Sequence, residues 1–274
     1  MGRSSTGGTA GPVTSPVHRL VVCPDWSAVC GAAAERFVAL AHERAARAGR
    51  FTVCLSGGAT PRPLYAMLAG PGFADAIPWT AVHVFWGDER CLPPEHGDNH
   101  FRLATDLMLS KVPIPAVNIH RIRGESPEPA AAAAEYEREI VNFFRLPPRI
   151  TPRFDLMLLG MGADGHVASL FPGTPGLQEE RRLVTAHFVP RLGAHRLTLT
   201  LPVLLRAREV MVLVAGEQKA EVLKAVFEGS DEPGLPARRL AAADGDVLWV
   251  VDEAAASRLP AGRQVPGTQE VPAR

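Results

Sequence analysis

Short apolar runs alternate with longer amphipathic stretches along most of this 274-residue chain. Apolar runs rich in Val, Leu and Phe are typical of parallel strands that are buried on both faces, and the stretches between them have the periodicity of covering helices. We therefore expect an α/β fold with a mostly parallel sheet. The expected strands are 19–23, 51–55, 81–85, 154–159, 210–215 and 247–251, and the expected long helices are 26–47, 99–109, 129–144 and 217–227. Two further β-prone pieces, 183–189 and 196–201, form either an edge hairpin or an extension of the sheet.

The two ends of the chain differ in composition from the part between them. Residues 1–16 are rich in Gly, Ser and Thr, and residues 258–274 carry three prolines among Gly and polar residues. Such segments bury little apolar surface, so we predict a disordered N-terminal arm and a disordered C-terminal tail. No internal repeat divides the remainder, and we expect a single catalytic domain over residues 17–257.

Charge, cysteine content and hydrophobicity exclude several classes of protein. The chain balances 29 Lys and Arg against 29 Asp and Glu, which provides no net field to attract nucleic acid. The cysteines show neither a CxxC pair nor the His spacing of a zinc finger, and we expect all of them to be reduced and buried. They are Cys23, Cys30, Cys54 and Cys91. No stretch approaches the ~20 apolar residues of a membrane span and residues 1–16 lack a signal-peptide run, so we expect a cytoplasmic protein.

The first unusual segment after an expected strand is 55–61, which reads LSGGATP. Parallel sheets bind ligands at the carboxyl ends of their strands, so chemistry is expected in such places. Gly57 and Gly58 let backbone amides converge, the Ser56 and Thr60 hydroxyls add donors, and the start of a helix favours an anion. No Gly-Lys-Ser/Thr follows, which excludes a Walker loop. The segment is either a phosphate site or a tight strand-to-helix turn.

A second segment, 85–90, reads FWGDER and again follows a strand. Asp88, Glu89 and Arg90 fit a substrate clamp, because a guanidinium suits a phosphate and a carboxylate can orient it or bind sugar hydroxyls. A solvated charged turn is the alternative interpretation. Asn99 lies at an expected helix start and fits an N-cap.

A third segment, 159–166, reads LGMGADGH and contains a formal G-x-G-x-x-G pattern. A dinucleotide fingerprint opens a long helix and is followed about 20 residues later by an acid at the end of the next strand. Pro and Gly residues within 172–176 block such a helix, so we reject the dinucleotide interpretation. The glycines instead let the backbone approach a ligand while presenting Asp164 and His166. Histidine suits general-base work near neutral pH, and a purely structural His is the alternative.

Lysine is scarce in this chain, which contains only Lys111, Lys219 and Lys224. Lys219 lies in the sequence AGEQKA, in the first turn of the expected helix 217–227. A cation there opposes the helix dipole. An anion bound nearby would explain this placement, and extension of the side chain into solvent is the alternative.

These segments, in this order, resemble the 6-phosphogluconolactonase family over residues 21–256. The resemblance is carried by LSGGATP (55–61), FWGDERCLPP (85–94), DLMLLGMGADGHVASLFPG (155–173), RLTLTLP (196–202) and AGEQKA (215–220). It implies a Rossmann-like three-layer α/β sandwich, with a mostly parallel central sheet and flanking helices. It also implies hydrolysis of 6-phospho-D-glucono-1,5-lactone to 6-phospho-D-gluconate, the second step of the oxidative pentose phosphate pathway, without metal or organic cofactor.

The resemblance further implies roles for individual residues. His166 would activate water as a general base, while Asp164 and Asp88 would shape and polarise the site. The residues expected to hold the substrate phosphate are Ser56, Gly57, Gly58, Arg90 and Lys219. Independently of the resemblance, we infer that backbone amides around Gly162 and Gly165 are candidate oxyanion donors. The expected partner is a small sugar phosphate, with no nucleic acid or membrane, and the chain is expected to be a monomer or a weak homo-oligomer.

Two positions depart from the family pattern. The family often has Ser-Asn where this chain reads Asp98-Asn99, and it usually has Thr where this chain has Val167. A hydroxyl contact at either position is lost, or was never needed. The expected catalytic groups are all present.

Two alternative functions stay open. Amino-sugar-phosphate deaminase/isomerases resemble this chain in the SGG-x-TP loop and the DGH motif, but Phe171 stands where they place an acid. Their acidic motif ends in Asp-Glu-Tyr, whereas this chain reads Asp88-Glu89-Arg90. The other alternative is a non-catalytic sugar-phosphate-binding protein of the kind fused to transcription regulators. Residues 1–16 are too short and too rich in Gly, Ser and Thr for a helix-turn-helix, but a stand-alone binding protein would keep the phosphate site.

Overall fold

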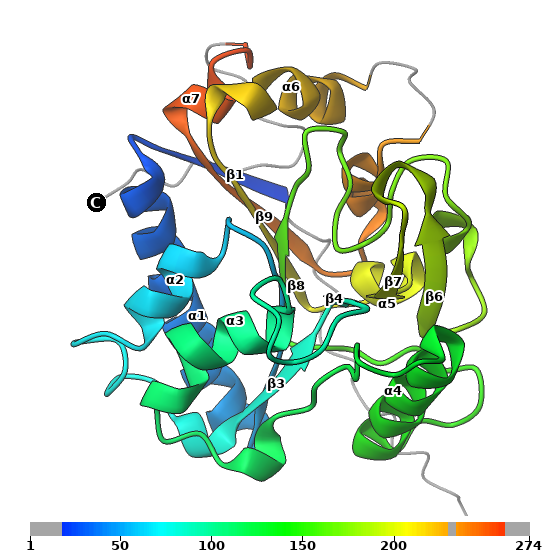
Figure 1. Cartoon of the computed structure of the whole chain (residues 1–274). Helices are drawn as coiled ribbons and strands as arrows, with labels where there is room; N and C mark the ends of the chain where they lie inside the picture. Colours follow the sequence, from blue (N-terminus) through cyan, green and yellow to red (C-terminus); the bar gives the residue numbers. More distant parts are fainter. Residues whose placement is uncertain (1–17, 230–233, 261–274) are drawn as a thin grey trace, which may run out of the picture.

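A six-stranded parallel sheet forms the centre of the computed structural model, which describes residues 18–229 and 234–260. Its strand order is β1-β9-β8-β5-β2-β3 (Figure 1). The strands are β1 (His18–Cys23), β2 (Phe51–Leu55), β3 (Val82–Trp86), β5 (Leu156–Gly160), β8 (Glu209–Val214) and β9 (Asp246–Asp252). Every neighbouring pair runs parallel. The α/β class is confirmed, and each expected strand is found to within two residues of its expected ends.

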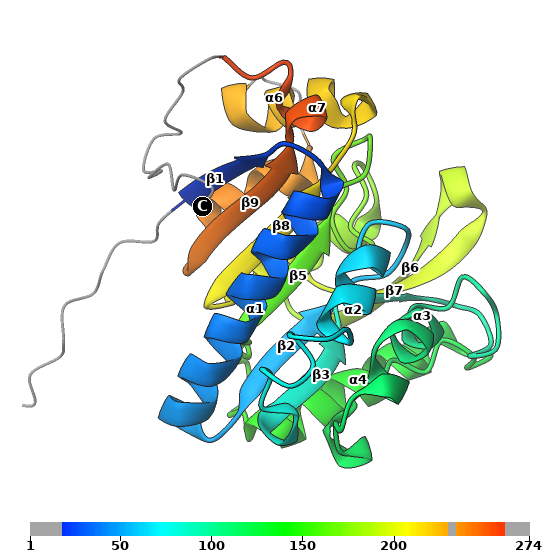
Figure 2. The ribbon, with the colours of Figure 1, turned by 90° about the vertical axis from the view of Figure 1, so that its left-hand side faces the viewer.

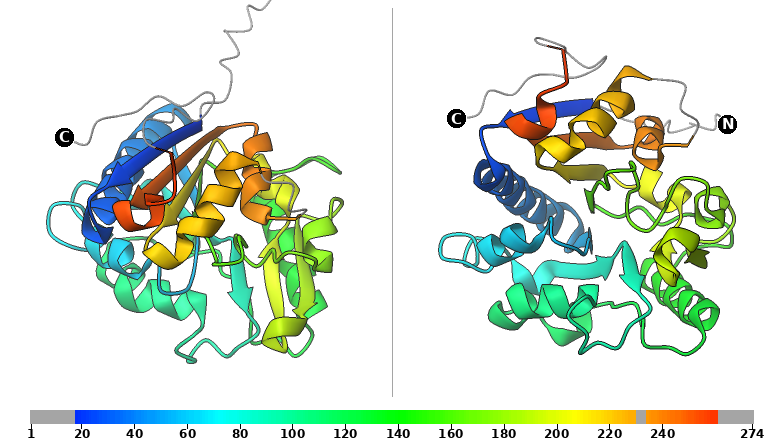
Figure 3. Two further views of the ribbon diagram at one scale, coloured as in Figure 1. Left: turned by 90° about the horizontal axis from the view of Figure 1, so that it is seen from above. Right: turned by 45° about the horizontal axis from the view of Figure 1, so that its top comes forward.

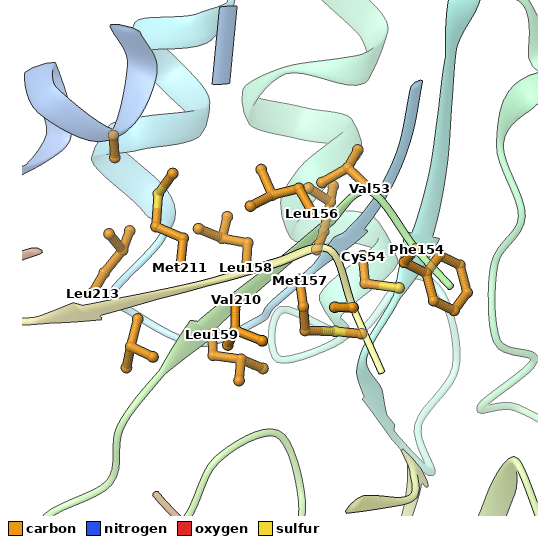
Figure 4. Packing of buried hydrophobic residues seen from close by; sticks show 14 of the residues in the cluster. Val53, Cys54, Phe154, Leu156, Met157, Leu158, Leu159, Val210, Met211 and Leu213 are labelled. Atoms are coloured by element: carbon orange, nitrogen blue, oxygen red, sulfur yellow. The ribbon is translucent and has the colours of Figure 1, made fainter. Parts of the chain in front are cut away.

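The core lies on both faces of this sheet. Strands β2 and β8 are buried at every residue. A strand covered on both faces needs apolar side chains at successive positions, which is why these strands read as continuous apolar runs instead of alternating ones. Side chains of the adjacent strands β2, β5 and β8 lie together in the core, among them Val53, Met157 and Met211 (Figure 4).

Helices cover the two faces and complete a three-layer arrangement. Helix α1 (Trp26–Ala48) crosses one face, with α2 (Arg62–Leu68) and α3 (His100–Leu107) on the same side (Figure 2). Helix α6 (Ala220–Glu228) lies on the opposite side of the strands, where Phe227 contacts Trp249 of β9 at 5.2 Å between ring centroids (Figure 3). The remaining helices are α4 (Pro129–Phe144), α5 (Leu201–Leu205) and α7 (Glu253–Ala256).

The ends of the helices follow local chemistry. Asp25 caps α1 by accepting from the Ala28 amide at 2.8 Å, and Gly49 ends this helix at φ +69°. Asn99 caps α3, as expected, by accepting from the Arg102 amide at 2.9 Å. The expected helix 99–109 is α3 followed by a 3-10 turn, and the expected helix 217–227 begins as the 3-10 turn Glu217–Lys219 before α6.

A second, smaller sheet stands beside the first one. It contains β4 (Asp88–Arg90), β7 (Ala194–Leu199) and β6 (Val184–Val189), in the order β4-β7-β6 and with antiparallel pairing. The two β-prone pieces are therefore a hairpin outside the central sheet. The interpretation of 88–90 as a solvated turn is wrong, because β7 supplies hydrogen-bond partners from more than 100 residues further along the chain. Gly87 joins the sheets: its amide donates to Leu55 O at 2.9 Å and its carbonyl accepts from the Leu199 amide at 2.8 Å.

The structure also bears on the predictions for the cysteines and for the two ends of the chain. All four cysteines are free, but only Cys23, Cys30 and Cys54 are buried. Cys91 is half-buried because it lies just beyond the end of β4, which corrects the prediction for that residue.

The predicted disordered arm (1–16) lies outside the described residues, as does 261–274 of the predicted tail. Residues 258–260 belong to the domain: Leu259 packs against the core and Arg258 pairs with Glu221 at 3.2 Å. No helix among the described residues is long and apolar enough to cross a membrane.

Candidate active site

A cleft of about 330 Å³ opens where four neighbouring strands, β8, β5, β2 and β3, reach their carboxyl ends. Its walls are the segments that follow these strands, the start of α3 and the β6–β7 hairpin. The predicted site residues that line it are Ser56, Gly57, Gly58, Asp88, Arg90, His166 and Lys219. Asp164 stands directly behind His166, to which it is hydrogen-bonded. The structure therefore brings together all the residues to which the family resemblance gives a catalytic or phosphate-binding role.

The loop after β2 is held by its backbone and leaves donors free. The Tyr65 hydroxyl of α2 donates to the Ser56 carbonyl at 2.5 Å and accepts from the Ser56 amide at 3.1 Å. The Gly57 and Gly58 amides donate to no acceptor among residues 18–229 and 234–260. Since α2 has only 7 residues, its dipole is short, and these free amides are the main donors that the loop offers to an anion.

Glycine is required at position 57 because the His100 ring packs closely against its backbone, as well as for the shape of the loop after β2. A Cβ built on Gly57 would lie 1.9 Å from Cδ2 and 2.3 Å from Nε2 of His100. The imidazole of α3 thus occupies the space that any side chain at position 57 would need. This contact joins the loop after β2 to the start of α3.

We expect Gly57→Ala to lower both the melting temperature and the affinity for phosphate, because the new methyl must displace the buried His100 ring or the loop. Overpacking of this kind typically costs ~1–3 kcal/mol. Thermal unfolding and phosphate titration would measure the two effects. Gly31→Ala is the matched control, since its Cβ meets nothing within 4 Å and its helical position favours Ala. Wild-type melting and phosphate affinity in Gly57→Ala would contradict the assigned packing.

Strand β4 directs its side chains by simple alternation. Asp88 and Arg90 line the cleft, whereas Glu89 points away and accepts from the His100 and Phe101 amides at 2.8 and 2.9 Å. Successive strand residues face opposite sides, so only one of the two acids can belong to the site. Burial raises the pKa of Glu89, and the nearby His100 and the amides only partly offset it. Glu89 is therefore an anchor for the start of α3 and no part of a substrate clamp.

Asp88 is fixed between two partners at the floor of the cleft. The Ser169 hydroxyl donates to its Oδ2 at 2.7 Å, and His100 Nδ1 lies 3.6 Å from its Oδ1. Burial raises the pKa of Asp88, but the His100 charge and the hydrogen bonds outweigh burial and leave the pKa below its usual value. Asp88 is therefore an ionised carboxylate whose oxygens already interact with Ser169 and His100. Such a carboxylate is suited to positioning these two side chains.

The loop after β5 presents His166 together with Asp164. His166 Nδ1 and Asp164 Oδ1 are 2.5 Å apart, and the His166 ring lies 4.3 Å from the Phe171 ring. Burial raises the pKa of Asp164, but the hydrogen bond and charge of His166 prevail and lower it to about 2. A Cβ on Gly162 would come within 1.9 Å of His166 Nδ1, so glycine at that position permits this arrangement.

The oxyanion expectation is not supported for the two glycine amides that were named. The Gly162 amide donates to His166 O at 2.9 Å, and the Gly165 amide donates to Gly162 O at 3.1 Å. Both amides hold the loop in its own shape. Donors for developing negative charge must come from other groups of the cleft.

Four cationic side chains line the cleft, and sequence reasoning found two of them. Arg90 and Lys219 were predicted, whereas Arg191 and Arg196 were missed. Burial lowers the pKa of Lys219, and Asp164 partly offsets this. Arg191 pairs with Asp164 at 2.7 Å and lies over the Phe171 ring at 4.6 Å. The cleft is therefore a strongly cationic environment that favours an anionic ligand.

The missed residues come from segments that carried little signal. Arg191 and Arg196 belong to the β6–β7 hairpin, which was recognised only as two β-prone pieces. Arg196 stood in the segment RLTLTLP, which could have marked it. His100 and Ser169 also line the cleft. Ser169 lay within the segment 155–173 that carried the resemblance, whereas His100 carried no signal beyond residue type.

The structure shows what surrounds Asp98 and Val167, the two residues that depart from the family pattern. Asp98 is 64% exposed in its side chain and pairs with Arg90 Nη1 at 2.9 Å, so this guanidinium already has a carboxylate partner. Val167 is fully buried in the hydrophobic core. An apolar side chain suits that position, and no hydroxyl is needed there.

Within the described part of the chain, no group of three or more His, Cys, Asp or Glu side chains is arranged to hold a metal ion.

Comparisons with known proteins identify relatives of this chain. The family of glucosamine-6-phosphate isomerases/6-phosphogluconolactonase matches residues 24–249. A 6-phosphogluconolactonase of Nostoc sp. is 40% identical over 239 residues, 87% of this chain and 97% of that protein. One from Streptomyces coelicolor is 37% identical over 253 residues, 90% of this chain and 96% of that protein.

Solved structures extend the comparison. A 6-phosphogluconolactonase from Trypanosoma cruzi has a TM-score of 0.80 at 27% identity and covers 90% of this chain and 98% of its own. The one from Thermotoga maritima has a TM-score of 0.73 at 29% identity, with coverage of 86% and 99%. A monomeric glucosamine-6-phosphate deaminase has a TM-score of 0.73 at 19% identity, with coverage of 88% and 99%, a likeness that shows the shared fold alone.

Proposed function

Because the chain belongs to the family of glucosamine-6-phosphate isomerases and 6-phosphogluconolactonases, we propose that it hydrolyses 6-phospho-D-glucono-1,5-lactone to 6-phospho-D-gluconate in the oxidative pentose phosphate pathway. The observation that carries this proposal is the Asp164–His166 pair at the edge of a cationic cleft. A general base beside an anion site fits a phosphorylated substrate that is attacked by water.

The pair determines which imidazole nitrogen is basic. With a pKa of about 2, Asp164 is ionised and can only accept, so His166 Nδ1 carries the proton and donates it. Nε2 is then the free base, and it takes a proton from the attacking water. The water oxygen bonds to the lactone carbonyl carbon, the bond from that carbon to the ring oxygen breaks, and the proton held by His166 passes to this leaving oxygen. Asp164 stabilises the imidazolium between the two transfers.

The substrate phosphate is assigned to the loop after β2 and to two cations of the same cleft. The free amides of the Ser56-Gly57-Gly58 loop offer donors, and Arg90 and Lys219 add charge. Charge-assisted hydrogen bonds are stronger than neutral ones, so the cations supply much of the affinity. The negative charge that develops on the lactone carbonyl is met by the remaining cationic side chains of the cleft.

The direct test generates the lactone in situ and follows acid release with and without the protein. The spontaneous rate is subtracted, because δ-lactones hydrolyse unaided. We expect release well above that rate. A rate equal to the spontaneous one, from a folded protein that still binds phosphate, would leave a non-catalytic binding protein as the function.

Glucosamine 6-phosphate is expected to bind but to release no ammonia. Its phosphate meets the same donors, but isomerisation needs acid/base groups beyond His166. The position where the deaminases place an acid holds Phe171, whose ring packs on His166 and cannot transfer a proton. Coupled ammonia detection measures this. Ammonia release that survives repurification and is abolished by His166→Ala would favour the deaminase alternative.

The setting of the reaction is also part of the proposal. We expect a cytoplasmic enzyme that acts on a small sugar phosphate and works as a monomer or a weak homo-oligomer. Cell fractionation tests the location. Light scattering across a range of protein concentrations tests the oligomeric state, and a tight oligomer at the lowest concentration would overturn that expectation.

A further inference from the structure

His100 is a second imidazole in the cleft, and the reaction scheme above gives it no task. It begins α3, lines the cleft and is only 6% exposed. A histidine buried to this extent normally satisfies both ring nitrogens within the protein. His100 satisfies only one of them.

The ring is anchored through Nδ1. This nitrogen donates to the Asp88 carbonyl oxygen at 3.1 Å, and it also lies 3.6 Å from Asp88 Oδ1 and 3.9 Å from Glu89 Oε1. A carbonyl oxygen only accepts, so Nδ1 carries a proton in either charge state. Protonation therefore occurs at Nε2.

Nε2 has no hydrogen-bond partner among residues 18–229 and 234–260. A Cβ on Gly57 would stand over the face of the ring, 1.9 Å from Cδ2 and 2.3 Å from Nε2, so this nitrogen lies beside the loop. The free Gly57 and Gly58 amides belong to the same loop. An unused nitrogen of a buried ring thus borders the place where the loop offers donors to an anion.

The surroundings favour a positive charge on this ring. Burial lowers the pKa of His100, but Asp88 and Glu89 outweigh it and raise the pKa to about 8. Both carboxylates lie on β4, and the packed loop 56–60 contributes no charged side chain. The other titratable or charged groups that line the cleft are Arg90, Arg191, Arg196, Lys219 and His166. The pKa in the folded protein exceeds the usual histidine value of 6.5, so the ion pairs stabilise the fold fully below about pH 6.5 and lose this effect as pH rises through about 8.

We propose that His100 is a substrate-binding residue whose protonated imidazole donates from Nε2 to the anion held by the Ser56-Gly57-Gly58 loop. The proposal rests on the proposed function for the identity of that anion as a sugar phosphate. Anion binding and protonation of His100 then favour each other. Affinity is high while the ring is charged and falls as it loses its proton.

Inorganic sulfate is the probe for this coupling, because it resembles phosphate and stays a dianion across the pH range of interest. Calorimetric titration should give a sulfate Kd that rises roughly tenfold between about pH 6.5 and 9 for the wild type. His100→Gln should bind roughly tenfold more weakly at the lower pH and lose most of this pH dependence. His83→Gln is the matched control, since His83 is a half-buried histidine of β3 that does not line the cleft. Its sulfate binding should equal that of the wild type.

An NMR titration of the wild-type histidines keeps the test independent of how well the variant folds. Saturating sulfate should raise the pKa of His100 and shift the Nε2 resonance. An unchanged His100 pKa, or a His100→Gln protein that is folded and retains the wild-type pH dependence, would overturn the proposal. Lactone turnover separates the two proposals. Sulfate-linked protonation without turnover would sink the lactonase function alone, and turnover with a KM unaffected by His100→Gln would sink the role of His100 alone.

Discussion

Replacement of His166 with Ala is expected to lower kcat for the phosphorylated lactone by ~10²- to 10⁴-fold, the usual loss on removal of a general base. The substitution removes the nitrogen that takes the proton from water, while the amide loop, Arg90 and Lys219 stay in place. Phosphate affinity and the melting temperature should therefore change little. Stopped-flow acid release, corrected for spontaneous hydrolysis, gives kcat, and titration with inorganic phosphate gives the affinity.

The control for this variant is His195→Ala. His195 is exposed on β7, where its ring contacts Phe188. Its loss should leave kcat at the wild-type level. If His166→Ala retained a near-wild-type kcat, the general base would have to be assigned to another group, and the Asp164–His166 pair would be structural.

Arg90→Ala and Lys219→Ala are expected to raise KM for the phosphorylated lactone by roughly 10- to 150-fold each, equivalent to the ~1.5–3 kcal/mol of a hydrogen bond to a charged group. Both side chains line the cleft, but neither takes part in the proton transfers proposed for His166, so kcat should fall less than KM rises. The unphosphorylated lactone should show little change in KM, since it lacks the group that these cations bind.

Lys224→Ala is the matched control for the lysine. Lys224 lies on α6, pairs with Glu228 at 3.8 Å and does not line the cleft. Its KM should equal the wild-type value for both lactones. Equal losses on phosphorylated and unphosphorylated substrates in Arg90→Ala or Lys219→Ala would show that the cation acts on something other than the phosphate.

The central sheet could be predicted from the sequence because its pattern is local. A strand buried on both faces must be apolar at successive positions, and the covering helices must be amphipathic. The ends of such parallel strands meet at one edge of the sheet. This is why segments as distant as the loop after β2 and Lys219 could be assigned to one site before any contact between them was known.

The small sheet could not be predicted in the same way. Strand β4 has three residues and pairs with β7 from more than 100 positions later, so its hydrogen bonds leave no local pattern. Once β4 is known to be a strand, alternation places Asp88 and Arg90 in the cleft and turns Glu89 toward α3. The residue types by themselves left both acids as candidates, and only the family resemblance favoured Asp88.

Residue identity and local spacing determined the parallel sheet, the glycine-rich loop and the presence of Asp164, His166 and Lys219 at strand ends. Tertiary structure decided how each side chain is used. It turned Glu89 into a helix anchor, occupied the Gly162 and Gly165 amides, and brought Arg191 and His100 into the cleft. The physical reason is the distance along the chain over which each property is determined. Burial patterns and turn chemistry are expressed within a few residues, whereas charge state and hydrogen-bond satisfaction depend on groups that only the folded chain brings within a few ångströms.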